Sequence, residues 1–286
     1  MAINDFKIED NVLVKYNGNN QHVIIPDGVK SIGESAFRGC SSLESVEIPD
    51  SVTSIGDRAF CGCESLKSIE IPDSVTSIGY NAFNGCSSLK FIEIPESVKS
   101  IDRGAFLGCL SLKSINVDED NENYTSVSGV LYNKDVTELI KCPNGLTSID
   151  ILESVTSIGR LAFFGCLHLE SIVIPNSVTC IGDSAFNFCS SLEFVKIPDS
   201  VTSIGKSAFE YCSSLQSIDI PNSVTSIGDE AFAYCENIKS IEIPGSVKSI
   251  GNSAFLGCKN LKEIRKPRGL DISRTEYPEG CKIVEY

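Results

Sequence analysis

The chain has 286 residues, and its 42% hydrophobic and 22% charged content excludes an intrinsically disordered polymer and supplies enough apolar side chains for a core. The formal net charge of −14 argues against a protein that binds nucleic acid or an anionic membrane through basic side chains. No apolar stretch is long enough for a membrane-spanning helix, and residues 1–7 lack the pattern of an export signal. We therefore expect a soluble chain, although a mature protein whose signal had been removed would look the same.

Residues 1–25 form the first predicted element, which we interpret as an N-terminal cap. Two apolar runs, Val12–Val14 and Val23–Ile25, flank the turn-forming segment Asn17–Asn20. This arrangement predicts a β-hairpin.

A repeat of 23 residues begins at Pro26 and gives four units over residues 26–117. Within the second unit, Leu66–Ile71 alternates apolar and polar residues, which predicts a short strand with one buried face. A second short extended piece follows the proline of each unit, and a turn at the Ala-Phe pair closes the coil. One coil of 23 residues cannot bury its apolar face alone, but parallel coils stacked about 4.8 Å apart share a continuous core. The repeat therefore predicts a solenoid, mainly β.

Residues 118–151 interrupt the period. Two strand-like runs, Gly129–Tyr132 and Thr137–Ile140, surround Asn133–Asp135 and predict a hairpin insertion. Residues 146–151 already supply the strand of the next coil, so we expect the insertion to project from an uninterrupted solenoid.

Five further units span residues 152–266, with Leu152 in the place of the proline. Residues 267–286 break the pattern again and are interpreted as a C-terminal cap, because an uncapped stack exposes its core. We expect residues 1–286 to form a single domain.

The shared pattern is Leu-x-x-Ile-x-Ile-Pro-x-Ser-Val-Thr-x-Ile-Gly-x-x-Ala-Phe-x-x-Cys. It resembles the BspA-like, or Treponema pallidum-type, leucine-rich repeat and covers all nine units. The resemblance implies a curved leucine-rich-repeat solenoid with a right-handed coil, and proteins of this kind resemble surface adhesins and interaction modules. The units depart from the pattern at a few positions: Asp102 replaces the first glycine, Phe188, Tyr211 and Tyr234 replace the glycine two residues after the phenylalanine, and Ile238 replaces the leucine.

Nine of the thirteen cysteines recur three residues after the Ala-Phe phenylalanine. We interpret this column as small buried hydrophobic side chains, since free cysteine is among the most buried residue types. So many free thiols favour a reducing environment, in mild conflict with a surface role.

Catalytic, metal and cofactor sites are not expected. Cys61 and Cys63 are too close for the usual zinc pair, and neither His22 nor His168 has a ligand partner at metal spacing. The acidic run Asp118–Glu122 lacks the glycine and the closing acid of a calcium loop, so we interpret it as a solvated turn.

The candidate binding site lies where outward strand residues depart from the repeat. Two phenylalanines replace serine in one outward column, and the next column carries a valine, a lysine and three consecutive glutamates that repel one another unless Lys67 and Lys90 offset them. The predicted partner-binding residues on the concave face are Phe91, Phe194, Val173, Lys196, Glu47, Glu70 and Glu93. The alternative to a binding role is that these residues reflect sequence divergence between the repeats, because isolated exposed phenylalanines are ordinary.

The function favoured is non-enzymatic protein binding by a monomer, with adhesion or host interaction at the cell surface or after secretion implied by the resemblance. The partner is expected to be a protein, with no nucleic acid and no membrane insertion. The alternatives are an intracellular interaction scaffold, which fits the free cysteines and a cytoplasmic location, and a structural spacer.

Overall fold

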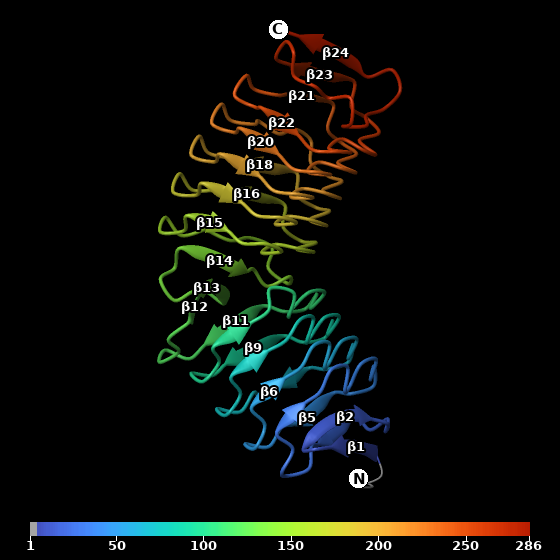
Figure 1. Cartoon of the computed structure of the whole chain (residues 1–286), viewed down its shortest axis with the longest axis vertical. Coiled ribbons are helices and arrows are strands. Elements are labelled where there is room, and N and C mark those ends of the chain that lie inside the picture. The colour runs from blue at the N-terminus through green and yellow to red at the C-terminus, as the bar shows by residue number, and fades with distance from the viewer. Residues whose placement is uncertain (1–4) are drawn as a thin grey trace. The chain divides into compact units, whose positions relative to one another are not determined.

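A computed structural model describes residues 5–286 as two compact units. Unit 1 runs to Asp135 and includes Pro143–Gly145, and unit 2 comprises Val136–Cys142 and Leu146–Tyr286. The division falls inside the insertion at residues 118–151. In Figure 1, unit 1 runs from blue to green and unit 2 from green to red.

The elements are short strands, and residues 5–286 contain no α-helix. Those of unit 1 are β1 (Phe6–Glu9), β2 (Val12–Tyr16), β3 (His22–Ile24), β4 (Ser31–Ile32), β5 (Ser45–Glu47), β6 (Ser54–Ile55), β7 (Ser68–Ile69), β8 (Ser77–Ile78), β9 (Phe91–Ile94), β10 (Ser100–Ile101), β11 (Ser114–Val117), β12 (Tyr124–Val127) and β13 (Val130–Asn133). Those of unit 2 are β14 (Glu138–Lys141), β15 (Ser157–Ile158), β16 (Ser171–Val173), β17 (Cys180–Ile181), β18 (Phe194–Lys196), β19 (Ser203–Ile204), β20 (Ser226–Ile227), β21 (Ser240–Glu242), β22 (Ser249–Ile250), β23 (Glu263–Lys266) and β24 (Lys282–Glu285).

Each unit is a β-solenoid whose regular coils contribute strands to two parallel sheets. Residues 146–151, which were expected to supply a strand, and residues 215–220 have no strand. The short-strand sheet runs β2-β4-β6-β8-β10 in unit 1 and β14-β15-β17-β19-β20-β22 in unit 2. The long-strand sheet comprises β3-β5-β7 and β9-β11 in unit 1, and β16-β18 and β21-β23-β24 in unit 2. Regular coils pair 23 residues apart, as Ile55 with Ile78 and Ile172 with Val195, so each residue type stacks on its own kind.

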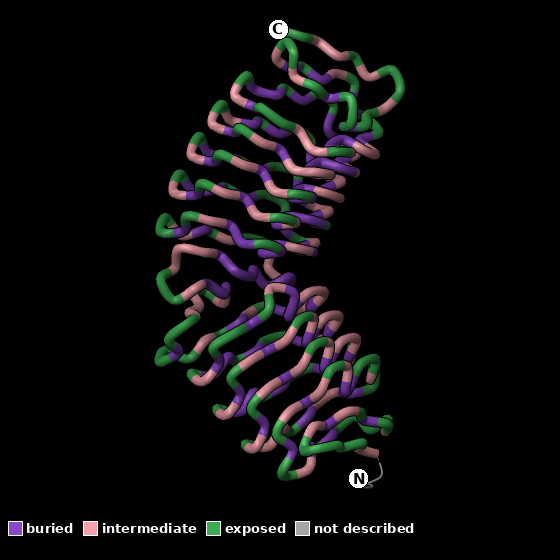
Figure 2. Tube along the Cα trace, in the orientation of Figure 1, coloured by how far each residue is buried: buried purple, intermediate pink, exposed green. Residues whose placement is uncertain are grey.

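Stacked phenylalanines fill the interior of both units. Figure 2 shows buried segments that recur from coil to coil. In unit 1 the rings of Phe60 and Phe83 lie 5.4 Å apart at 2°, and in unit 2 those of Phe186 and Phe209 lie 5.1 Å apart at 1°. Tyr16 continues the unit 1 column, 5.2 Å from Phe37.

The cysteine column lies beside these rings. Each Sγ from Cys63 to Cys109 and from Cys189 to Cys258 donates a hydrogen bond to the carbonyl oxygen of the phenylalanine 26 residues earlier, at 3.1 to 3.2 Å. None of the thirteen cysteines forms a disulfide, and eight of the nine column members are buried; Cys40, in the first regular coil, is half-buried. Each of these carbonyl oxygens also accepts from the backbone N–H of the cysteine in its own coil, so the thiol of the next coil supplies a second donor.

The N-terminal segment differs from the prediction. The hairpin pairs β1 with β2 around Asp10 and Asn11. The strands β2 and β3 were expected to pair with each other. Instead, β2 pairs in parallel with β4 in the short-strand sheet, and β3 pairs in parallel with β5 in the long-strand sheet. The residues around Asn17–Asn20 therefore connect two sheets of a first coil instead of closing a hairpin.

The insertion is packed where it was expected to project. In unit 1, β12 and β13 form a hairpin whose turn lies at Ser128 and Gly129, and not at the predicted Asn133–Asp135. The Thr137–Ile140 run, which was expected to form the second strand of the hairpin, supplies β14 of unit 2 instead. Val130, Leu131 and Tyr132 are buried. Because β12 and β13 also contact β11 of the last regular coil, the insertion is part of the unit 1 core.

Asn121 anchors the start of the insertion. Its side chain is fully buried, its Nδ2 donates to the carbonyl oxygens of Pro95 and Val98, and its Oδ1 accepts from the backbone N–H groups of Asn123 and Tyr124. This one amide therefore joins two carbonyl groups of the preceding coil to two N–H groups of its own turn.

The C-terminal segment forms a last, shortened coil. β24 pairs in parallel with β23, and Lys266 Nζ donates to the carbonyl oxygen of Leu270 and contacts Glu285 Oε1 at 2.5 Å. This buried lysine ties the final strand to the coil before it.

Candidate functional site

The predicted binding residues point outward on the long-strand sheet. Phe91, Val173 and Phe194 are 49%, 60% and 48% exposed, and Lys196, Glu47, Glu70 and Glu93 are exposed as well. The structure places Phe91 and the three glutamates in unit 1, and Val173, Phe194 and Lys196 in unit 2. They therefore form two sets, described separately below.

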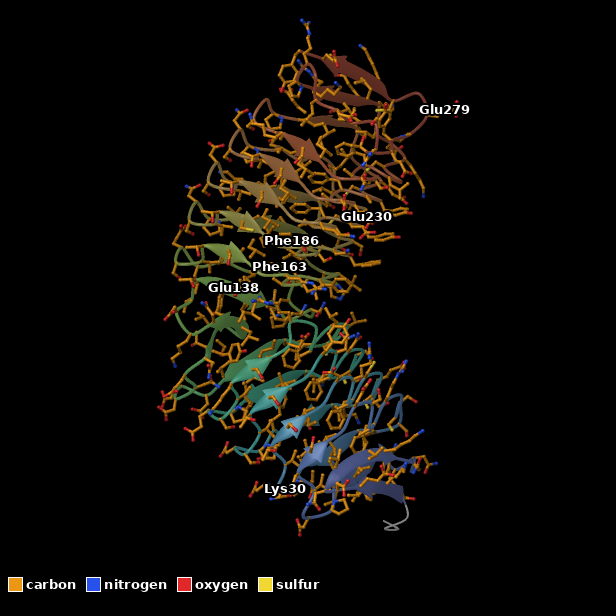
Figure 3. All side chains as sticks on the ribbon, in the orientation of Figure 1. Lys30, Glu138, Phe163, Phe186, Glu230 and Glu279 are labelled. Carbon is orange, nitrogen blue, oxygen red and sulfur yellow. The ribbon has the colours of Figure 1, made fainter. Side chains whose placement is uncertain are left out.

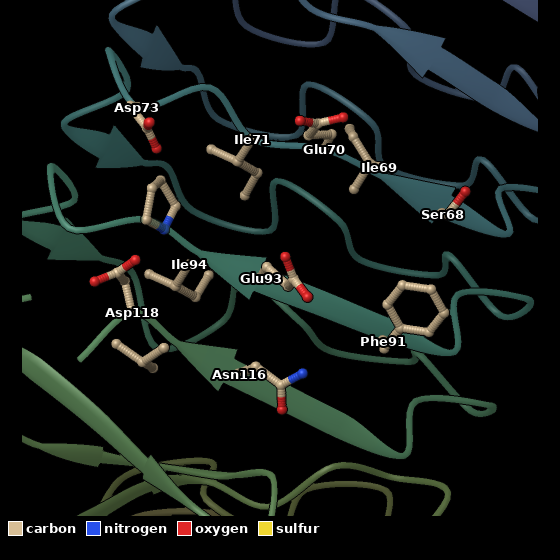
Figure 4. Close-up of a pocket in the computed structure, with 12 residues that line it drawn as sticks. Ser68, Ile69, Glu70, Ile71, Asp73, Phe91, Glu93, Ile94, Asn116 and Asp118 are labelled. Carbon is tan, nitrogen blue, oxygen red and sulfur yellow. The ribbon is translucent and has the colours of Figure 1, made fainter. Parts of the chain in front are cut away.

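Three members of the unit 1 set, Phe91, Glu70 and Glu93, line a groove of about 740 Å³ across β7, β9 and β11. Figure 4 shows Phe91 at one end, Asp73 and Asp118 at the other, and Glu70 beside Glu93 between them. The lining residues are Ser68, Ile69, Glu70, Ile71, Asp73, Phe91, Glu93, Ile94, Pro95, Asn116, Val117 and Asp118. Glu47, on β5, lies outside the groove.

Sequence reasoning missed two carboxylates of this groove, those of Asp73 and Asp118. Asp73 follows Pro72, shortly after the end of β7 at Ile69, and Asp118 opens the insertion. The periodic Pro-Asp turn was a usable signal for Asp73, because strand ends on neighbouring coils lie side by side.

The groove is acidic without compensation. Within residues 5–286, no Lys or Arg forms an ion pair with Glu70, Glu93 or Asp73. Lys67, which was expected to offset the glutamates, instead pairs with Glu44 and lowers the pKa of that carboxyl by its hydrogen bond. The wall of Phe91 and the floor of buried isoleucines supply apolar contact beside these charges.

The unit 2 set lies on two adjacent strands, β16 and β18. Ser171 pairs with Phe194 and Val173 pairs with Lys196, so the exposed valine and phenylalanine are diagonal neighbours. A second hollow, of about 400 Å³, lies beside β16 and is lined by Val173, Asp150 and Glu153 among others.

A separate surface of unit 2, which we name the aromatic ladder, comprises Phe164, Phe188, Tyr211 and Tyr234. The rings of Phe188 and Tyr211 lie 4.4 Å apart at 10°, and those of Tyr211 and Tyr234 lie 4.4 Å apart at 1°. Phe164 lies 5.7 Å from Phe188 and is tilted by 58°. Phe188 is 42% exposed, and the other three are half-buried.

The ladder occupies a backbone position that favours glycine. Phe188, Tyr211 and Tyr234 have φ values of 60°, 59° and 58°, and the corresponding residues of neighbouring coils are Gly165 and Gly257. A left-handed conformation costs a non-glycine residue about 1 to 2 kcal/mol. Each stacked pair contributes about 0.5 to 1.5 kcal/mol beyond its buried area, so stacking offsets part of that cost.

Two carboxylates flank the ladder. Glu210 Oε2 accepts from Asn187 Nδ2 at 2.9 Å, and Glu230 Oε2 accepts from Ser207 Oγ at 3.2 Å. Partial burial, and then the nearby Tyr234 hydroxyl and these carboxylates, raise the pKa of Tyr211. In Figure 3, Glu230 lies at the margin of the coils, away from the interior rings of Phe163 and Phe186.

Comparison with known proteins identifies the repeat. The family described as the BspA type leucine-rich repeat region matches residues 7–128 and 140–262 in six copies. The chain belongs to the BspA-type leucine-rich repeat family. Leucine-rich repeats of this kind are typically protein-interaction modules. No curated protein matches the chain in sequence.

Solved bacterial structures share the fold of this BspA-type protein. The pneumococcal vaccine antigen PcpA is 25% identical over 93% of this chain and 74% of its own, with a TM-score of 0.75. A leucine-rich cell surface protein of Faecalibacterium prausnitzii is 28% identical over 96% of both chains, with a TM-score of 0.64. A leucine-rich repeat protein of Eubacterium ventriosum is 27% identical over 87% of this chain and 88% of its own, with a TM-score of 0.56.

Among the residues that the structure describes, no three His, Cys, Asp or Glu side chains converge as ligands for a metal ion. The described part of the chain also has no helix that is long and apolar enough to cross a membrane.

Proposed function

We propose that this protein is a non-enzymatic binding module that engages a protein partner through the long-strand sheet, in adhesion or host interaction at the cell surface or after secretion. The observation that carries the proposal is the exposure of Phe91, Val173 and Phe194 at outward positions where other coils carry small or polar residues. Exposed aromatic and aliphatic side chains beside charge have the composition of interface anchors. The family and the cell surface protein of F. prausnitzii support the surface location.

The groove of unit 1 strengthens the proposal. Phe91 supplies apolar surface at one end, and four carboxylates line the remainder. A partner with an apolar side chain next to basic ones complements this arrangement, and its association should weaken as salt screens the charges.

The test compares binding of the full chain and its Phe91→Ser/Phe194→Ser variant to immobilised extracellular-matrix proteins and to epithelial cells. Serine is the residue that most other coils carry at these positions, so the fold should persist while affinity falls about tenfold or more. Leu110→Ser is the matched control, because Leu110 is 42% exposed and lies outside both predicted sets. Equal binding by the double variant and the control would remove these residues from the interface.

An interaction scaffold in a reducing compartment is the second candidate, and the thirteen cysteines, none of which forms a disulfide, favour it. Fractionation of the native cells distinguishes the two, since a surface protein is accessible to an impermeant label in intact cells and a scaffold is not.

A further inference from the structure

The aromatic ladder is a feature that the long-strand sheet does not explain. It belongs to the closing turns of three successive coils and to Phe164 of the coil before them, within unit 2 alone. In the other coils the corresponding position is glycine: Gly39, Gly62, Gly85, Gly108, Gly165 and Gly257. The coil therefore does not require an aromatic residue at this position. Phe188, Tyr211 and Tyr234 nevertheless adopt there a backbone conformation that favours glycine.

The ladder is also incompletely covered. Phe188 stacks on Tyr211 at one face, but the coil before it has Gly165 at the same position, so no side chain of that column covers its other face. Phe164 meets Phe188 at a 58° tilt and leaves it 42% exposed. The end of the stack is therefore open to a flat group of a partner.

The flanking carboxylates lack cationic partners. In the described chain, Glu210 and Glu230 form no ion pair with Lys or Arg, and each is held by one neutral donor, Asn187 Nδ2 or Ser207 Oγ. These bonds fix the carboxylates while leaving their negative charge uncompensated.

We propose that the aromatic ladder with Glu210 and Glu230 is a second docking surface, which takes an extended, arginine-bearing segment of a partner protein. Arginine fits because its planar guanidinium stacks on aromatic rings and donates hydrogen bonds to carboxylates. The ladder spans three coil steps, about 14 Å at 4.8 Å per coil, which matches four to five residues of extended chain. A lysine-bearing segment matches the charge but lacks the planar group.

The experiment measures binding of a labelled decapeptide of alternating arginine and proline to the full chain by fluorescence anisotropy. The glutamate-proline decapeptide and the lysine-proline decapeptide serve as comparison probes. We expect the arginine peptide to bind at least tenfold more tightly than the lysine peptide, and the glutamate peptide not to bind. Absence of binding by the arginine peptide, or equal binding of the arginine and lysine peptides, would overturn the assignment of an arginine-bearing partner.

Because the chain is acidic overall, the decisive variant keeps the net charge constant. Phe188→Gly/Tyr211→Gly/Tyr234→Gly installs the repeat's own residue at all three positions and should weaken binding at least tenfold with no change of charge. Unchanged affinity in a folded triple variant would show that the peptide binds by general charge attraction, and the proposal would fail.

A second variant covers the case in which the triple variant does not fold. Glu210→Gln/Glu230→Gln keeps the rings and should weaken binding about tenfold, whereas Glu96→Gln/Glu153→Gln removes the same charge elsewhere and should change it less than twofold. Equal losses in these two variants would contradict the proposal. Phe91→Ser/Phe194→Ser should leave peptide binding unchanged, which separates this surface from the long-strand sheet.

The remaining alternative is that a second copy of this chain occupies the ladder, and sedimentation velocity detects such self-association. If the wild type dimerises at micromolar concentration and the triple glycine variant does not, the ladder joins two copies of this chain and the proposed partner is wrong.

Discussion

A single side chain in the phenylalanine column has a defined environment on both faces. Phe83 lies between Phe60 and Phe106, at 5.4 and 5.8 Å, and is fully buried. Truncation at such a site removes apolar contact and leaves a cavity, because neighbouring coils relax only in part.

We therefore expect Phe83→Ala to lower the free energy of unfolding by about 3 to 5 kcal/mol, measured by urea titration. Phe91→Ala is the matched control, since Phe91 is 49% exposed, and should change the stability by about 0.5 kcal/mol or less. Equal midpoints for the two variants would contradict the assignment of the column to the core.

Sequence periodicity predicted burial at the residue scale because each buried position recurs with its coil. It predicted the outward direction of Phe91, Val173 and Phe194 for the same reason. It did not predict the aromatic ladder, whose members appeared only as departures at a glycine position. Their stacking depends on the left-handed backbone of three consecutive turns, which side-chain patterning does not encode.

At the scale of elements, the insertion is a structural part of unit 1. Asn121 replaces the regular contacts between coils with four side-chain hydrogen bonds to backbone groups. Leaving buried backbone groups unpaired is expensive, since each such group costs about 1 to 3 kcal/mol.

Asn121→Ala is accordingly expected to destabilise unit 1 by roughly 3 kcal/mol or more. The readout is hydrogen exchange of the amides in β9, β11 and β13, which should lose protection. Asn123→Ala removes an exposed amide two residues away and should leave that protection unchanged. Loss of protection in both variants alike would mean that the side chain of Asn121 does not anchor the turn.

The hairpins show why pairing was harder to predict than strand existence. Strand-forming runs such as Val12–Val14 and Val23–Ile25 were recognisable, but each pairs with a strand of the next coil, 19 or 23 residues away. Local turn signals favour pairing with the strand nearest in sequence, whereas the stack of coils offers each strand a parallel partner in the next coil. The burial of Tyr132 was likewise not predicted, because the sequence pattern does not show that β13 packs against β11.

Across the whole molecule, the thiol column links stability to pH. Burial is the main cause that raises the pKa of Cys189, Cys212 and Cys235 well above the ordinary value, and that raises the pKa of Cys258 to about 12. Above pH 9 the unfolded chain loses these protons while the folded chain keeps them. The folded state then binds more protons, so its stability falls as the pH rises from about 9 towards 12.

We expect the urea midpoint to be level between pH 7 and 8 and to decline steadily from pH 9 to 10.5. A Cys212→Ala/Cys235→Ala variant has fewer such thiols and should show a shallower decline from its own value at pH 7.5. Parallel pH profiles for the variant and the wild type would show that other groups cause the decline.

The near-identity of successive coils also creates a problem of degeneracy during folding. A chain that pairs one coil out of step, offset by 23 residues, still places valine on valine, cysteine beside a phenylalanine carbonyl and serine on serine. Such a slipped chain loses few regular contacts, so the regular coils discriminate weakly between correct and shifted alignments. Unique residues must mark the native alignment: the Tyr16 ring on Phe37, the Asn121 amide under Val98, and the three aromatic residues in the turns of unit 2. The irregular positions of this protein thus fix the register in which its repetitive coils align.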